Sequence, residues 1–232
     1  MSNILEARNL TKVYTREAAL DNISMTIPGG KIIGLLGPNG SGKTTLIKLI
    51  AGLLVPTSGE LYIDGHVPGE KTKAVVSYLP ERPYFQNSMK ICDMLSYFED
   101  FYADFDRQRA EQMLYDLHIP LDARMRTLSK GTKEKVQLVL VMSRRAKLYL
   151  LDEPIAGVDP AAREYIMRTI LTNYGEDSTI IISTHLITDI EQILDEFVFI
   201  HRGRIVRAGN ADDVRIEEQK SLDQLFREVF KC

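Results

Sequence analysis

The sequence lacks the features that would place a protein in a bilayer, in an oxidising compartment or on nucleic acid. It has no tryptophan and two cysteines, Cys92 and Cys232, in no metal-binding spacing, which is typical of free thiols in a reducing compartment. Its formal charge of −3 gives no general attraction to nucleic acid or anionic lipid. No apolar run approaches the roughly 18 residues of a membrane span, and residues 1–6 lack a signal-peptide layout. We expect no nucleic-acid partner, and a membrane role only through a partner chain.

One segment, in contrast, has a pattern with a defined chemistry. Residues 37–44 match the phosphate-loop pattern G-x-x-x-x-G-K-[ST] without a mismatch. The apolar run 31–36 leads in as a buried strand, and residues 45–51 leave as a helix. Such a loop points successive N–H groups at a polyphosphate, and the helix dipole adds positive charge. The alternative, an accidental Gly-rich turn, is expected in roughly one chain of this length in a hundred.

The loop therefore predicts a nucleotide site in which residues have separate tasks. We expect Lys43 to reach the β- and γ-phosphates and the Thr44 hydroxyl to ligate Mg²⁺. The predicted phosphate-binding residues are Gly37, Pro38, Asn39, Gly40, Ser41, Gly42, Lys43, Thr44 and Thr45.

Strand-like and helical patterns alternate along the chain. Strand-like runs are found at residues 4–8, 19–27, 60–65, 74–79, 147–151 and 179–183. Helical periodicity covers about 90–146 and the stretches between and after the last two strands. This alternation argues for an α/β fold with a parallel sheet buried on both faces, into which the helical stretch is inserted.

Two of these strands end in polar side chains. The run 147–151 is followed by Asp152 and Glu153, and the run 179–183 ends in Ser-Thr-His. Because the carboxyl ends of neighbouring parallel strands open onto one crevice, Asp152 would hold Mg²⁺ and Glu153 would face the γ-phosphate and a water. His185 would point into the same crevice and orient Glu153. Acids at a strand end are often plain turn residues and a lone histidine is usually structural, but the phosphate loop upstream favours function.

In order and spacing, these motifs resemble those of the ATP-binding subunit of ABC transporters, over nearly the whole chain. Residues 37–44 resemble Walker A and 148–153 Walker B, and residues 128–132 lie where the family has its L-S-G-G-Q signature. Residues 156–159 resemble the D-loop, and His185 the switch histidine. Tyr14 resembles the aromatic that stacks on adenine, although an aromatic after a strand is often packing.

The resemblance implies a P-loop NTPase (RecA-like) α/β core with an N-terminal antiparallel β region and an inserted α-helical subdomain. The expected organisation is a single ABC-type ATP-binding domain over residues 1–232. Its core would span about 1–88 and 147–232, and its helical subdomain about 89–146.

The same resemblance implies a mechanism. ATP and Mg²⁺ would bind between Walker A of one subunit and the signature of another, in a homodimer or heterodimer. Ser129 and Gly131 would touch the γ-phosphate held by the opposite subunit, and Asp159 would couple the two sites. ATP would join the halves and hydrolysis would separate them.

Hydrolysis would be an in-line attack by water, with Glu153, His185 and Lys43 as the catalytic residues. Its output would be transport through an integral-membrane permease subunit, with the chain bound to the cytoplasmic face of the cell membrane.

Three positions depart from the family pattern. The Q-loop position carries Glu81 instead of Gln; a carboxylate can still offer an oxygen to Mg²⁺ or its water, but adds negative charge beside a triphosphate. The signature has Lys130 for Gly and Thr132 for Gln. Lys130 either faces the nucleotide and compensates for Glu81 across the dimer, or points to solvent. Y-L-P-E and L-S-K-G-x-K-x-K resemble the branch paired with ABC-2 type membrane proteins, mostly bacterial exporters, so export is the expected direction.

Two soluble ABC classes are the alternatives. Proteins of DNA repair and chromosome structure need a long heptad insertion, but only 46 residues separate Glu81 from Leu128. Ribosome-acting factors need two tandem nucleotide domains, and the chain has one Walker A. Both features favour the transporter ATPase.

Aromatic residues are concentrated after the Q-loop. Residues 84–105 hold seven of the chain's eighteen tyrosines and phenylalanines. Tyr97, Phe101 and Phe105 follow at i, i+4 and i+8, as on one helix face. They are either the core of the helical insertion or, as the resemblance implies, part of the groove that receives a coupling helix of the permease. Tyr84 and Phe85 are the expected surface contributors.

Overall fold

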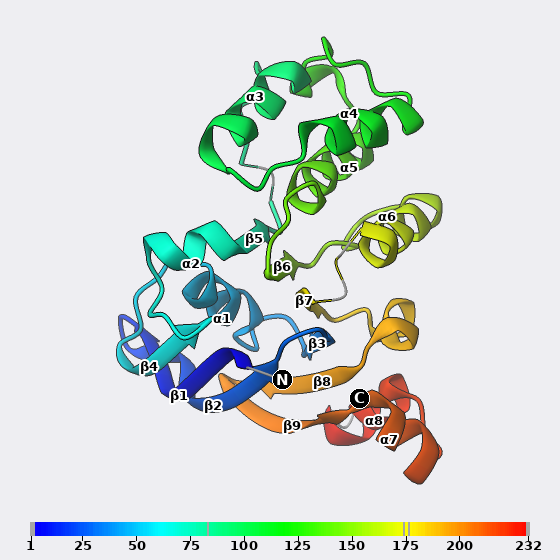
Figure 1. The fold of residues 1–232 in the computed structure, drawn as a ribbon. Helices are drawn as coiled ribbons and strands as arrows, with labels where there is room; N and C mark the ends of the chain where they lie inside the picture. The colour runs from blue at the N-terminus through cyan, green and yellow to red at the C-terminus, as the bar shows by residue number, and fades with distance from the viewer. Residues whose placement is uncertain (1–2, 83, 174, 176, 231–232) are drawn as a thin grey trace.

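The computed structural model describes residues 3–82, 84–173, 175 and 177–230. These residues form two β-sheets and a set of helices, with α3, α4 and α5 grouped above strand β5 in the view of Figure 1. The strands are β1 (Asn3–Tyr14), β2 (Glu17–Pro28), β3 (Ile32–Leu36), β4 (Ser58–Ile63), β5 (Val76–Leu79), β6 (Leu148–Asp152), β7 (Thr179–Thr184), β8 (Glu196–His201) and β9 (Arg204–Asn210). The α-helices are α1 (Lys43–Ile50), α2 (Glu70–Val75), α3 (Ile91–Phe101), α4 (Arg107–Asp116), α5 (Lys130–Met142), α6 (Pro160–Asn173), α7 (Ala211–Glu217) and α8 (Leu222–Phe230). Short 3₁₀ turns are η1 (Met125–Thr127), η2 (Ile187–Asp189) and η3 (Glu191–Ile193).

The larger sheet has the strand order β5-β6-β7-β3-β8-β9, and all neighbours are parallel except β8 and β9. Strand β3 lies inside it and is buried along its whole length. Ile32 and Leu36 face one apolar cluster, while Ile33 and Leu35 face another on the opposite side. Side chains alternate across a strand, so a continuous apolar run fits a strand that is covered on both faces. The predicted α/β fold with a buried parallel sheet is confirmed.

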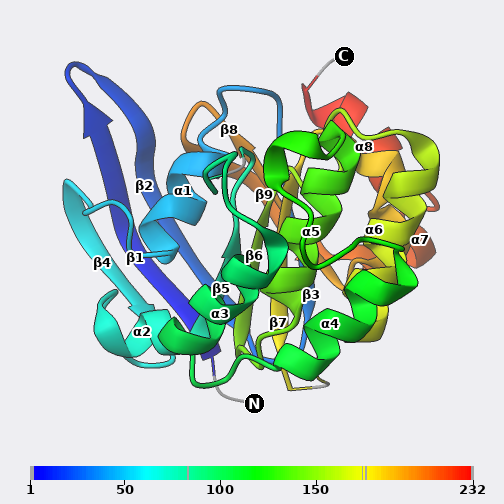
Figure 2. The same ribbon diagram turned by 90° about the horizontal axis from the view of Figure 1, so that it is seen from above.

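The smaller sheet, β2-β1-β4, is antiparallel and packs over α1. Leu46, Ile47, Leu49 and Ile50 of α1 are buried in the cluster that the two sheets share. Helix α1 is therefore clamped between the sheets, as Figure 2 shows from above. The N-terminal antiparallel β region expected from the resemblance is present.

Helices α3, α4 and α5 enclose an apolar cluster of their own. Helix α5 also contributes Leu138, Val141 and Met142 to the cluster under the large sheet, so it joins the two parts. Arg144, which follows α5 and is 2% exposed, donates to the backbone carbonyls of Ala74 and Val76 and forms an ion pair with Asp104. These buried bonds fasten the three helices to strand β5.

The prediction of helices after residue 183 is wrong for residues 196–210. Strands β8 and β9 form a hairpin there, joined by Arg202 and Gly203, whose φ angles are +47° and +75°. Two successive positive φ angles belong to the two-residue turns that match strand twist. The apolar run 196–201 forms a strand because it pairs with β3 and β9 in the folded protein. Periodicity in the sequence does not reveal such long-range pairing.

Three further observations concern the start of strand β5, the position of the last helix and the length of the helices. The predicted strand 74–79 begins at Val76, because the two residues before it end α2. The last helix, α8, docks on the core, with Leu222 and Leu225 buried and the Phe226 ring edge-on against Phe199. In the part of the chain that the structure describes, no helix has the length and apolarity to span a bilayer.

Candidate functional site

The carboxyl ends of β6, β7 and β3 meet at one edge of the large sheet, and the loop after β3 lies across it. Leu36 pairs with Thr184, and Asp152 pairs with Ser183. The motifs predicted from separate segments are therefore brought together. They surround an open cleft of about 360 Å³. Its lining residues are Ala19, Asn39, Gly40, Ser41, Gly42, Lys43, Thr44, Thr45, Glu81, Glu153, Ala156 and His185.

The loop rests on a support that sequence reasoning missed. Gly42 precedes α1 with φ +111°, and a Cβ there would lie 2.6 Å from the Ala19 carbonyl oxygen. Gly203, in the β8–β9 turn, donates its N–H to the Ser41 carbonyl at 2.8 Å and accepts from Asp21 N–H at 2.8 Å. The available signal was the dipeptide 202–203 between two apolar runs, which is a hairpin signature.

Lys43 is bonded to its own loop. Its Nζ donates to the carbonyl oxygens of Gly37 at 2.7 Å and Pro38 at 3.2 Å, and it lies 3.4 Å from Glu153 Oε1. The side chain is 5% exposed. Burial lowers the pKa of the Lys43 ammonium, and the charge of Glu153 opposes that shift. Because its side chain is buried, the Lys43 charge would act strongly on an anion that replaces those carbonyls.

Glu153 has an unusual backbone and many partners. Its φ of +50° is left-handed, which is uncommon for a residue other than glycine and is found at functional sites. Its N–H donates to the Ser183 carbonyl at 3.0 Å, and its carboxylate accepts from Thr184 Oγ1 at 3.2 Å. His185 Nδ1 lies 3.0 Å from Oε2. An ionised carboxylate only accepts, so this histidine nitrogen carries the hydrogen.

Asp152, at the end of β6, is 1% exposed. Its Oδ1 accepts from Ser183 Oγ at 2.6 Å and from Thr44 Oγ1 at 3.1 Å. Its Oδ2 is buried and has no partner among the described residues. Burial raises the pKa of the Asp152 carboxyl, and the charges of Glu81 and Glu153 raise it further, while the Ser183 and Thr44 hydroxyls lower it. A partnerless carboxylate oxygen beside a threonine hydroxyl fits Mg²⁺, which prefers oxygen ligands.

Six predicted nucleotide contacts do not line this cleft: Gly37 and Pro38, which begin the loop, and Tyr14, Ser129, Gly131 and Asp159. Tyr14, at the end of β1, is 45% exposed and has the Lys12 ammonium 5.4 Å from its ring centre. Ser129 begins α5 and is exposed. A Cβ on Gly131 would lie 3.7 Å from Asp159 Oδ2, so the signature and D-loop segments adjoin each other.

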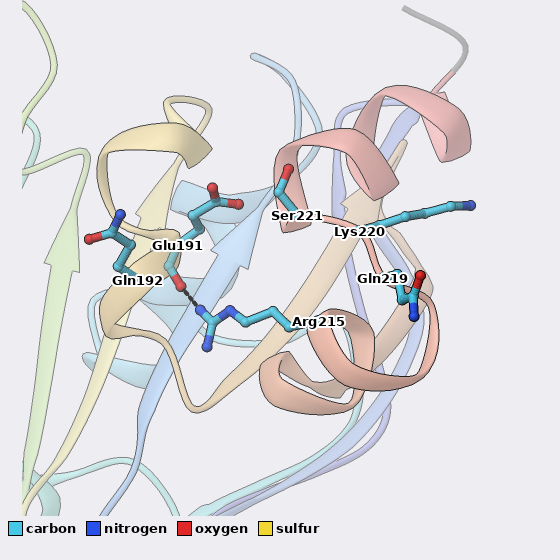
Figure 3. Close-up of a pocket in the computed structure, with 6 residues that line it drawn as sticks. All are labelled: Glu191, Gln192, Arg215, Gln219, Lys220 and Ser221. Atoms are coloured by element: carbon cyan, nitrogen blue, oxygen red, sulfur yellow. Dashed lines mark hydrogen bonds between the residues drawn. The ribbon is translucent and has the colours of Figure 1, made fainter.

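A second hollow, of about 420 Å³, is lined by η3, α7 and residues 219–221, which connect α7 to α8 (Figure 3). The Arg215 guanidinium donates to the Glu191 backbone carbonyl and to Asp212 Oδ1 at 2.6 Å. The Glu191 carboxylate accepts from the Asp223 N–H at 3.2 Å. These polar groups hold the C-terminal helices in place, so the hollow is a structural joint.

The assembled motifs agree with a family model. The model described as "ABC transporter" matches residues 20–156, more than half of the chain. The chain belongs to the ABC transporter family. It is an ATP-binding subunit of that family and hydrolyses ATP, as the resemblance implied.

Individual relatives agree with this assignment. The ABC transporter ATP-binding protein YtrB of Bacillus subtilis is 31% identical over 96% of this chain and 77% of its own. The lipopolysaccharide export system ATP-binding protein LptB of Acidithiobacillus ferridurans is 30% identical over 92% of this chain and 93% of its own. A solved ATP-binding subunit of an ABC transporter has a TM-score of 0.88 at 29% identity, covering 98% of this chain and 99% of that one. The predicted P-loop NTPase fold is confirmed.

Proposed function

We propose that the cleft binds ATP with Mg²⁺ and that Glu153 is the base for attack of water on the γ-phosphate. The observation that carries this is the placement of one carboxylate between Lys43, 3.4 Å away, and His185, 3.0 Å away, at the mouth of the phosphate loop. A positioned carboxylate next to a phosphate-binding lysine is the arrangement that hydrolysis of a phosphoanhydride needs.

Binding would exchange the partners of Lys43. The carbonyls of Gly37 and Pro38 now accept its hydrogens. Phosphate oxygens would replace them, because an anion is a stronger partner for a desolvated ammonium than a neutral carbonyl. Lys43 would then hold the β- and γ-phosphates while loop N–H groups surround them.

Thr44 and Asp152 would hold Mg²⁺, and Glu81 would reach it through water. The carboxylates of Glu81 and Glu153 and the Lys43 ammonium line the cleft, and Asp152 accepts a hydrogen bond from Thr44 beside it, so a bare triphosphate would meet net negative charge. When bound, Mg²⁺ neutralises charge that develops on the phosphate oxygens. The orphaned Asp152 Oδ2 would gain a partner at the same time.

His185 would fix the geometry of the reaction. Its Nδ1–H holds the Glu153 carboxylate, and its ring is 38% exposed toward the cleft. Glu153 would take the proton of the attacking water, and the Thr184 hydroxyl would keep the carboxylate facing it.

The complete site would need a second subunit. Ser129 and Gly131 lie on α5, away from the cleft of their own chain, and Asp159 adjoins them. We infer that they complete the site of another copy or of a related chain, as a homodimer or a heterodimer.

The chain would form one domain with two parts, the α/β core at about 1–88 and 147–232 and the helical part at about 89–146. The apolar cluster around α3–α5 supports this division. The exposed aromatics Tyr97 and Phe101 in the helical part, together with Tyr84 just before it, would dock a permease at the cytoplasmic face of the membrane. Export is the proposed direction, in line with the relative named for lipopolysaccharide export.

The test of the catalytic assignment is Glu153→Gln, which keeps the shape and removes the base. We expect ATP to bind with unchanged affinity and turnover to fall about a hundredfold or more. An ATP-bound dimer should accumulate in size-exclusion chromatography. Glu217→Gln on α7, an exposed position far from the cleft, is the matched control. Turnover near that of the wild type in Glu153→Gln would assign the base elsewhere.

A further inference from the structure

The first turn of α5 carries two of the residues that depart from the family pattern, and both are engaged within the subunit. The Ser129 hydroxyl lies 2.8 Å from Thr132 Oγ1 and accepts from the Thr132 N–H at 3.2 Å. Thr132 therefore holds the serine as the cap of its own helix. These bonds within the subunit fix the first turn of the signature helix.

Lys130 extends from this turn across to the D-loop segment, residues 156–159. Its Nζ lies 2.8 Å from the point that a Cβ on Gly157 would occupy. Gly157 has φ +70°, so the D-loop turns sharply where the ammonium meets it. The lysine does not simply extend into solvent, although 73% of its side chain is exposed.

Glu134, one turn further along α5, supplies the opposing charge. Its Oε1 lies 3.8 Å from Lys130 Nζ, and its side chain is 20% exposed. Its Oε2 is buried and has no partner among the described residues. Burial raises the pKa of the Glu134 carboxyl, Lys130 lowers it, and the charge of Asp159 raises it. The charge of this carboxylate attracts the ammonium and favours the lysine conformation that lies at Gly157, although a pair this exposed adds little to folding stability.

We propose that Lys130 is a positioning residue that holds the D-loop against the signature helix, with Glu134 as its anchor. This proposal rests on the proposed function only in that the D-loop and signature serve the site of a second subunit. In the isolated chain, Lys130 fixes the D-loop at Gly157. When a γ-phosphate held by another subunit meets Ser129 and Gly131, it competes with Glu134 for the ammonium and frees the D-loop to move. Through Lys130, nucleotide binding at one site would thus change the position of the D-loop, which couples that site to the second one.

The first test measures the D-loop directly in the full 232-residue chain without nucleotide. The Ala156 N–H donates to the Glu153 carbonyl at 3.1 Å and marks the order of this segment. We expect Lys130→Met to speed hydrogen exchange of the Ala156 amide about tenfold, because local opening is governed by the contacts around it. Glu134→Gln should do the same, and Lys130→Arg should restore protection. Unchanged exchange in Lys130→Met would overturn the proposal.

The matched control is Lys133→Met, on the same helix with the same loss of charge; its side chain has no hydrogen bond or ion pair with the other described residues. Exchange at Ala156 should stay as in the wild type. An equal increase in exchange in Lys133→Met would also overturn the proposal, because the effect would then follow from the lower net charge of the helix and not from the position of Lys130. Melting temperatures of all variants should match, since Lys130 is exposed.

The second test is steady-state ATP hydrolysis. Lys130→Met and Glu134→Gln should each lower kcat about three- to tenfold with KM changed less than about twofold, and the double variant should be no slower than the slower single one. Additive losses would overturn the coupling. Failure of the proposed function would be visible separately as full activity in Glu153→Gln, and it would leave the exchange result unaffected.

Discussion

The nucleotide cleft and the aromatic face formed by Tyr84, Tyr97 and Phe101 are built in opposite ways. In the cleft, Lys43 and Asp152 are 5% and 1% exposed, and Glu153 is held in a left-handed conformation by bonds to its backbone and its carboxylate. On the aromatic face, Phe101 and Tyr84 are 67% and 52% exposed and are held mainly by stacking on a neighbouring ring. The groups proposed to perform chemistry are fixed from several sides, whereas the groups proposed to dock a partner have fewer contacts.

The contrast has a physical basis. The electrostatic interactions of a charged group become stronger when water is excluded. They stabilise a transition state only if the partners of the group are already in place, because reorganisation during the reaction would cancel the gain. A docking surface contributes through apolar area and needs little preorganised charge. The two regions should therefore be sensitive to different substitutions, and different measurements should detect the loss: ligand binding and stability for the cleft, and partner binding for the aromatic face.

The largest effect is expected when exposed aromatic rings are removed and the result is compared with removal of a buried ring. Tyr84→Ala combined with Phe101→Ala should weaken binding to the permease about thirtyfold, since interface aromatics contribute about 2 kcal/mol or more. Melting temperature and ATP affinity should stay unchanged. The measurement is quantitative co-purification with the native membrane partner, identified by mass spectrometry as an integral-membrane protein.

Phe98, which is 3% exposed and stacks on Phe105 and Tyr102, is the matched control. Phe98→Ala should cost about 3–5 kcal/mol of folding stability. If the exposed pair lowered the melting temperature as much and left the partner bound, the docking role of this face would be wrong.

A smaller effect tests Tyr14, which does not line the cleft in the structure. If its ring stacks on adenine, Tyr14→Ala should weaken ATP binding about fivefold, the equivalent of about 1 kcal/mol. Binding of tripolyphosphate, which has no base, should not change. Isothermal titration calorimetry with ATP and with tripolyphosphate measures both affinities. An equal loss of affinity for the two ligands would show that Tyr14 supports the fold and does not stack on the base.

The smallest effect concerns the buried charge of Asp152. Its pKa is raised in the folded state, so the ionised form destabilises the fold at neutral pH, and this penalty disappears as pH falls through the raised value toward that of the unfolded chain. Asp152→Asn should therefore raise the melting temperature of the nucleotide-free protein by about 2–4 °C at pH 7, the equivalent of about 1 kcal/mol.

Scanning calorimetry across pH and ligand checks this prediction. The gain of Asp152→Asn should shrink on acidification, and addition of ATP and Mg²⁺ should stabilise the wild type more than the variant. A variant that melts lower than the wild type at pH 7 without ligand would mean that the bonds from Thr44 and Ser183 outweigh the buried charge.

Local patterns predicted most of the cleft, because its residues lie within short motifs at strand ends. The phosphate loop, Asp152, Glu153 and His185 could be placed from sequence alone, since parallel strands share one edge. The contact of Lys130 with Gly157 could not, because it depends on how α5 lies beside a loop that is distant in the chain.

The aromatic stripe shows the same limit. Helix α3 ends at Phe101, so Phe105 is not on the predicted i, i+4, i+8 face. Tyr84 is exposed as expected, but Phe85 is half-buried against Phe98. Which side of a helix is buried depends on its neighbours, and these are set by tertiary packing.

The position of β3 has a consequence for synthesis of the protein. The strand that presents the phosphate loop pairs with no strand made earlier: Ile32 pairs with Ile180, and Ile33 pairs with Glu196. A ribosome adding about 5–20 residues per second needs roughly 10 to 30 s to supply those neighbours. During that interval the apolar strand has exposed edges, and the loop lacks the turn at Gly203 that supports it. We therefore expect nucleotide to stabilise the chain only after translation has passed β9.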